Sequence, residues 1–203
     1  MEKEYLKFND HIKDIEEHYW EGLKRIKDYY EGRKENPSLK DPSHEILEKV
    51  ATQFFLETIN SCNEPKRISD PSSLYEVCIG CGTEILMKAI ILLKKPDEFI
   101  KNQEMGFSKT KAILLNILPE NLTDKQRERI SDVLNMIKLK RDKWAHLSFH
   151  KFDAYHEAYQ IFHVLEYLYQ TYFPNSEVLK EIKEFKERNR VQAGTDFEPV
   201  EFD

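Results

Sequence analysis

The chain has 203 residues, of which 40% are hydrophobic, and a net charge of -6. This length and apolar content suffice for a folded core, whereas the negative balance excludes a global positive field that would attract nucleic acid or anionic lipid. The first ten residues are charged throughout and no run of about 18 apolar residues occurs, so we expect a cytoplasmic protein with neither a membrane span nor a secretory signal.

The composition predicts an all-α fold, because glycines and alternating β-branched residues are scarce. A first amphipathic helix is expected over residues 2–31, where apolar side chains recur at steps of three and four: Leu6, Ile12, Ile15, Tyr19, Leu23, Ile26 and Tyr30. A second helix is expected from a Ser43 cap to Ile59. The polar stretch over residues 60–71 then predicts a linker.

A third helix is expected from residue 72 or 73 to Lys94, and it is apolar over most of its surface, which is typical of a central helix. Pro96 is expected to end it, before a variable loop. Ser108 is expected to cap a short helix that ends at Pro119.

Thr123 is expected to cap a fifth helix that starts at Asp124, because Gln126 stands three positions later as in a capping box. An aromatic helix should follow an Asp153 cap, and its stripe from Tyr155 to Tyr172 predicts core packing and a dimer interface. A charged helix over 176–190 and an acidic tail complete the chain.

Three units are expected from this order of elements. Residues 1–70 form an N-terminal helical extension, residues 71–175 a helical bundle, and residues 176–203 a C-terminal helix with the acidic tail.

The fifth helix carries a charge where its core-facing stripe should continue. Its apolar positions Ile130, Val133, Leu134 and Ile137 are followed on the same face by Arg141. Because an unpaired buried guanidinium is costly, Arg141 should pair with an acid or face a cavity or partner surface.

His146 lies five residues after Arg141 and is the side chain best suited to act as a general acid or base near neutral pH. Basic side chains surround the two, with Asp142 the one acid among them: Lys138, Lys140, Lys143, His150 and Lys151. This local basic patch should attract anionic ligands.

A guanidinium that brackets a phosphate and an imidazole that moves a proton can cleave RNA without a metal ion. RNA supplies its own nucleophile, because the 2'-hydroxyl can attack the adjacent phosphorus once a base removes its proton. No carboxylate cluster or spaced histidine pair indicates a metal site or cofactor.

The segment RDKWAH, residues 141–146, resembles the R-x4-6-H motif of HEPN domains, the helical ribonucleases of toxin-antitoxin, abortive-infection and CRISPR-associated systems. The preceding helix GTEILMKAIILL, with Glu84 and Lys88, a variable loop and a following aromatic helix match the HEPN order. The resemblance covers residues 74–173. It implies an up-down helical bundle, here with additional N-terminal helices.

By this resemblance Arg141 and His146 are the catalytic pair and Asp142 the polar residue that orients them. Lys143, Lys140 and His150 are expected to bind substrate. The resemblance also implies a homodimer whose two motifs meet at the interface, an RNA substrate, no cofactor, and a possible antitoxin or regulatory partner.

A second hypothesis makes the chain a catalytically inactive helical module that binds a protein partner, a nucleotide or uncleaved RNA. Arg141 then forms a structural salt bridge, with Glu84 as the expected partner, and His146 caps a helix C-terminus as a favourable cation. The surroundings of Arg141 separate the two hypotheses: a buried one-to-one pair favours the module, and a solvent-reachable cleft shared with His146 favours catalysis.

Cys78 and Cys81 form a CxxC pattern that could indicate a thiol or zinc protein. Cys62 is the remaining cysteine, and no second pair completes four ligands, so we expect both residues to pack in the core. Gly80 and Gly82 should let helices approach closely. His156 and His163 lie seven residues apart, too far for adjacent helical ligands, and are expected to be ordinary histidines.

Overall fold

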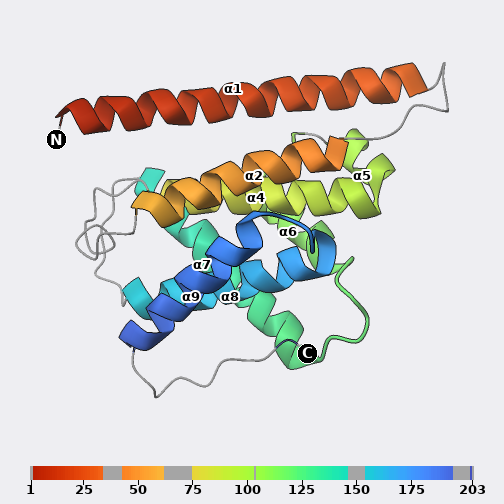
Figure 1. Cartoon of the computed structure of the whole chain (residues 1–203). Helices are drawn as coiled ribbons and strands as arrows, with labels where there is room; N and C mark the ends of the chain where they lie inside the picture. Colours follow the sequence, from red (N-terminus) through yellow and green to blue (C-terminus); the bar gives the residue numbers. More distant parts are fainter. Residues whose placement is uncertain are drawn as a thin grey trace.

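In the computed structural model, residues 2–33, 43–61, 75–102, 104–145, 154–193 and 202 are described, and their regular elements are all α-helices (Figure 1). The predicted all-α class is therefore confirmed. The helices are α1 (Glu2–Arg33), α2 (Ser43–Ser61), α4 (Tyr75–Lys94), α5 (Pro96–Lys101), α6 (Phe107–Leu115), α7 (Asp124–Ala145), α8 (Ala154–Tyr172) and α9 (Val178–Ala193).

Helix α4 is the centre of the fold. It packs against α2, α5, α6 and α7, while α8 packs mainly against α9. Figure 1 shows α2 and α4 side by side beneath the long α1, with α7, α8 and α9 on the far side of them. From residue 85 to 92 the side chains of α4 are all buried, because a helix that is apolar all round can be covered on every face. This confirms the predicted central position.

Two glycines of α4 let neighbouring helices approach closely, as the sequence predicts. A Cβ atom on Gly82 would lie 2.9 Å from Cβ of Phe54 and 3.0 Å from the ring of Phe55, both on α2. A Cβ atom on Gly80 would lie 2.8 Å from Cβ of Arg141 on α7. Larger side chains at either position would push the helices apart.

The chain after α4 differs from the prediction. Pro96 was expected only to end the third helix, yet it also opens α5, because proline lacks a backbone donor that the first turn does not need. The Ser108 cap is wrong: α6 begins at Phe107 with Gly106 as its N-cap, and no side chain caps it. Phe107 is 1% exposed, so core packing rather than a cap fixes this start. The helix ends at Leu115, earlier than the expected Pro119.

The predicted capping box before α7 is confirmed. The backbone N–H of Gln126 donates to Thr123 Oγ1 at 3.2 Å, and the N–H of Thr123 donates back to Gln126 Oε1 at 2.9 Å. Helix α9 begins at Val178, two residues later than expected, and Ser176 instead donates to Glu48 of α2. The expected Asp153 cap and most of the expected linker lie outside the described residues.

The aromatic stripe of α8 packs inside the chain, which confirms the core part of its prediction. Its buried members include Tyr159, Phe162, Leu165, Leu168, Tyr169 and Tyr172. Tyr169 meets Phe55 of α2 edge to face, with 6.0 Å between ring centroids.

No helix in the described ranges combines the length and the apolar character that crossing a bilayer requires.

Candidate functional site

The candidate site lies where α7 crosses α4. On α7 the predicted core stripe is buried, with Ile130, Val133, Leu134 and Ile137 each no more than 1% exposed. One turn further along the same face, the Arg141 side chain is 27% exposed. The stripe therefore delivers a guanidinium to the edge of the core, as the sequence predicts.

Three groups hold the Arg141 guanidinium. Its Nη1 donates to Glu84 Oε2 on α4, and its Nε and Nη2 each lie 3.4 Å from Asp142 Oδ1. The guanidinium carbon lies 5.2 Å from the ring centroid of Phe107, within cation–π range. The methylene stem of Arg141 packs on the space that Gly80 leaves open. The guanidinium is thus held by two acids and an aromatic ring from α4, α6 and α7, and its stem packs on a glycine of α4.

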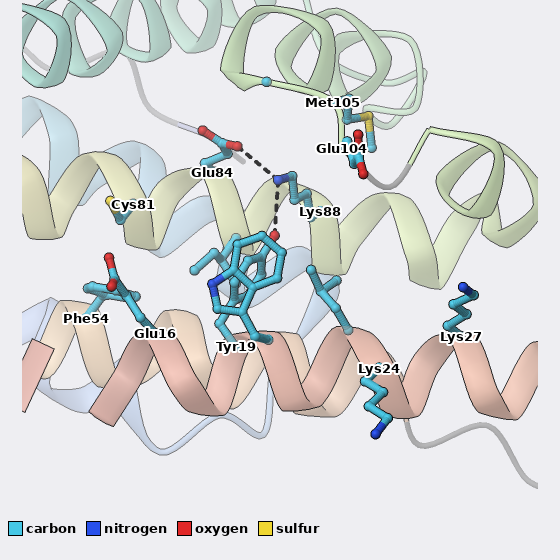
Figure 2. Close-up of a pocket in the computed structure, with 14 residues that line it drawn as sticks. Glu16, Tyr19, Lys24, Lys27, Phe54, Cys81, Glu84, Lys88, Glu104 and Met105 are labelled. Atoms are coloured by element: carbon cyan, nitrogen blue, oxygen red, sulfur yellow. Dashed lines mark hydrogen bonds and ion pairs between the residues drawn. The ribbon is translucent and has the colours of Figure 1, made fainter. Parts of the chain in front are cut away.

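The Glu84 carboxylate contacts two cations, Lys88 and Arg141, and Figure 2 draws its contact with Lys88 as a dashed line. Its Oε1 lies 2.9 Å from Lys88 Nζ, while its Oε2 accepts from Arg141. Lys88 also donates to Tyr19 Oη of α1 at 3.1 Å. The Lys88 side chain is only 7% exposed. Burial by itself lowers the pKa of Lys88, but the oxygens of Tyr19 and Glu84 outweigh it and raise the pKa, so Lys88 is a buried ammonium.

Asp142 stays ionised on the outer side of the site. It lies 3.2 Å from Lys138 and contacts Arg141, and its side chain is 41% exposed. Slight burial acts to raise the pKa of Asp142, but the hydrogen bond from Lys138 and the charge of Arg141 outweigh it and hold the pKa below its ordinary value. Asp142 can therefore orient Arg141 as a carboxylate.

Of the residues predicted to bind substrate, the structure describes the side chain of Lys140 alone. Lys140 points into the packing between α7 and α8, where it is 6% exposed and paired with Glu157. The Lys143 side chain, His146 and His150 lie outside the described residues. The pairing of Arg141 with His146 therefore stays a prediction.

The two described cysteines are free thiols within α4. Cys78 is 1% exposed, in line with the predicted core position. Burial raises the pKa of Cys81 to about 11, against the partly opposing charge of Arg141, so this thiol stays protonated near neutral pH and is a weak nucleophile. In the described part of the chain, no cluster of His, Cys, Asp and Glu has the geometry to hold a metal ion. The His163 ring stacks on Tyr159 and lies tilted against Phe202.

A cavity of about 720 Å³ adjoins the Glu84–Lys88 pair, between α1, α4 and the residues before α6. Its wall includes Tyr19 and Trp20 of α1, Glu84 and Lys88 of α4, and Met105. Figure 2 shows Tyr19 rising from α1 to meet Lys88 across this space. Sequence reasoning did not predict the cavity: the Glu84–Lys88 spacing of four residues marks a helical ion pair, but no local pattern places Tyr19 or Phe107 beside it.

Comparisons of this chain with protein-family models, with curated proteins and with solved structures found no match. The site joins one partly exposed guanidinium and one buried ammonium with two carboxylates, so its formal charges balance.

Proposed function

We propose that this chain is a metal-independent endoribonuclease of the HEPN type, acting in toxin or antiviral defence. One observation carries the proposal: Arg141 reaches the edge of the core with its guanidinium partly exposed, and Glu84 and Lys88, which the resemblance marks on the upstream helix, lie in the same polar cluster. Residues distant in sequence are thus joined around the arginine of the motif.

The fixed guanidinium supports phosphate binding. Arginine has five N–H donors, and the contacts with Glu84 and Asp142 account for three of them in the described structure. Two donors remain for a phosphate oxygen. Because Gly80 and Phe107 already hold the side chain, little ordering is left to be done when the charged transition state forms.

In the proposed reaction His146 removes the proton of the ribose 2'-hydroxyl, and the 2'-oxygen attacks the adjacent phosphorus. The bond from phosphorus to the 5'-oxygen breaks, and the leaving oxygen takes up a proton from protonated His146 or from water. The products are a 2',3'-cyclic phosphate and a 5'-hydroxyl. Arg141 stabilises the phosphorane, Asp142 orients Arg141, and Lys143 and His150 supply local positive charge. Lys140 serves the packing of α7 on α8 instead.

The proposal includes a homodimer in which the motifs of two protomers meet. RNA would then contact Arg141 and His146 of both copies. The N-terminal helices, α1 and α2, are the segments through which an antitoxin or regulatory partner would control the site, because α1 borders the cavity beside Glu84.

The test is cleavage of tRNA and mRNA by the purified chain in the presence of EDTA. Wild-type protein should cleave and leave cyclic phosphate ends, whereas Arg141→Ala and His146→Ala should fold and lose cleavage at least 100-fold, which is the lower limit of the roughly 10²–10⁴ that one proton-transfer group contributes. The matched control is Arg190→Ala on α9, where the side chain is 56% exposed and pairs only with Glu187 among the described contacts. Cleavage that needs a metal ion and survives both substitutions would contradict the proposal.

The inactive helical module is the second candidate, and a specific observation favours it. Arg141 is engaged by Glu84, Asp142 and Phe107, as a structural arginine would be. The same assay separates the two functions: RNA that binds in a filter or gel-shift measurement but stays intact with every preparation supports the module.

A further inference from the structure

The cavity between α1 and α4 has the size and the wall of a ligand site. Its volume of about 720 Å³ falls within the range of small-molecule pockets, roughly 300–1,000 Å³. Apolar atoms make up most of the wall, which is typical of such pockets, and three lysines and three glutamates also line it: Lys24, Lys27, Lys88, Glu16, Glu84 and Glu104. Five apolar side chains line the cavity: Trp20, Leu23, Phe54, Ile85 and Met105.

Trp20 provides the first indication of the ligand. It lines the cavity, yet 65% of its surface is exposed, and Tyr19 meets it edge to face with ring centroids 5.4 Å apart. A large indole left in contact with water beside an apolar cavity offers a planar body a stacking surface.

Lys88 provides the second indication. An ammonium has three N–H donors, and Glu84 and Tyr19 accept two of them. The third has no acceptor among the described residues. Because Lys88 is 7% exposed and borders the cavity, an anionic group that entered would meet a desolvated cation with a free donor. Lys27 of α1 also lines the cavity, and its side chain points toward α4 in Figure 2.

We infer that this cavity binds a small planar aromatic molecule that carries one anionic group. The ring lies against Trp20 and the apolar wall, and the carboxylate or phosphate accepts from Lys88. A nucleoside monophosphate and an aromatic carboxylate share this chemistry. The inference does not rest on the proposed cleavage of RNA, because Arg141 and Asp142, the residues of the RDKWAH segment whose side chains are described, do not line the cavity.

Substitution of Glu84 should change the affinity for the ligand in a direction that damage to the fold would not. Its carboxylate neutralises Lys88 through one oxygen while the other holds Arg141. Removal of that negative charge leaves Lys88 more attractive to an anion. Glu84→Gln should therefore tighten binding of the ligand several-fold, an effect opposite to that of general damage to the fold.

The experiment is isothermal titration calorimetry of the full chain with adenosine 5'-monophosphate and with indole-3-acetate. Binding of either probe supports the inference, and the probe that binds identifies the source of the anionic group. Adenosine and inorganic phosphate, the two parts of adenosine 5'-monophosphate, are the controls. Each should bind at least about tenfold more weakly than adenosine 5'-monophosphate, since stacking and a charge-assisted hydrogen bond each contribute to the affinity.

Variants then locate the site. Trp20→Ala, at an exposed position that folding does not need, and Lys88→Met should each weaken binding about tenfold or more. Lys180→Met on α9, where the side chain is 78% exposed, is the matched control and should leave binding unchanged. His146→Ala, which should abolish cleavage, should also leave it unchanged, so failure of one proposal is distinguishable from failure of the other.

Alkylation of Cys81 supplies a second measurement, because this thiol lines the cavity. A bound probe should slow its reaction with iodoacetamide at alkaline pH, as followed by mass spectrometry of the individual cysteine. No binding of either probe at millimolar concentration, or equal binding by wild type, Trp20→Ala and Lys88→Met, would overturn the inference.

Discussion

On one side of α4, Gly82 lies against Phe54 and Phe55 of α2, and on another, Gly80 lies against Arg141 of α7. The two glycines are two residues apart and allow equally close contact. The first contact brings together apolar side chains, and the second brings a guanidinium to Glu84. Close helix approach therefore builds either core or site, and the residue that the partner helix presents decides which.

The substitution with the largest expected effect removes the apolar contact between α2 and α4. Phe55→Ala should lower the free energy of unfolding by about 3–5 kcal/mol, because the ring is fully buried between α4 and Tyr169 and its loss leaves a cavity. Urea denaturation followed by circular dichroism measures it. Val191→Ala, at a position 76% exposed, is the control and should change stability by less than about 0.5 kcal/mol. A similar loss in both variants would show that α2 does not pack on α4 as described.

The substitution with the next largest effect removes the polar contact between Glu84 and Arg141. Glu84→Ala removes the acceptor of both Lys88 and Arg141 and should lower the free energy of unfolding by about 1.5–3 kcal/mol, the range for hydrogen bonds to charged groups. Glu187→Ala, whose exposed carboxylate pairs with Arg190, should lower it by less than about 0.5 kcal/mol. If the two glutamates prove equal in urea denaturation, the Glu84 cluster is not a stabilising contact.

A double-mutant cycle sharpens the difference between the two glycines. A methyl group at Gly80 displaces Arg141, so Gly80→Ala already loses part of the contact with Glu84. Gly80→Ala and Glu84→Gln should therefore be coupled by about 1 kcal/mol in the free energy of unfolding. Gly82→Ala faces α2 and should be additive with Glu84→Gln to within about 0.5 kcal/mol. Equal coupling at both glycines would contradict the separate roles of these contacts.

A pH-dependent effect concerns Cys81, which lies between the two glycines in sequence. Burial raises the pKa of Cys81 to about 11 from its ordinary 9.0, so the folded chain keeps this proton more firmly than the unfolded chain. The related stability is complete below pH 9 and is lost as the pH rises from 9 to 11. Unfolding free energies measured across this window should fall more steeply for wild type than for Cys81→Ala. Parallel slopes would show that the thiol is not desolvated.

The sequence alone determined the helical class, the central position of α4 and the arrival of a charge at the end of the buried stripe of α7. These follow from local periodicity, which states which face of a helix is apolar. The Thr123 capping box was also predictable, since both partners lie within one turn. The Ser108 cap was not, because the burial of Phe107 outweighed a local hydrogen bond.

The tertiary structure decided which groups meet Arg141. The sequence offered Glu84 as a partner, but only the packing of α4, α6 and α7 placed Phe107 on the guanidinium and brought Arg141 to a carboxylate that Lys88 of the same helix also contacts. The same holds for the cavity, whose wall joins α1 to α4 through Tyr19 and Lys88. Ion pairs and cavities between helices depend on distances across the fold, and these distances cannot be predicted from the periodicity of one helix.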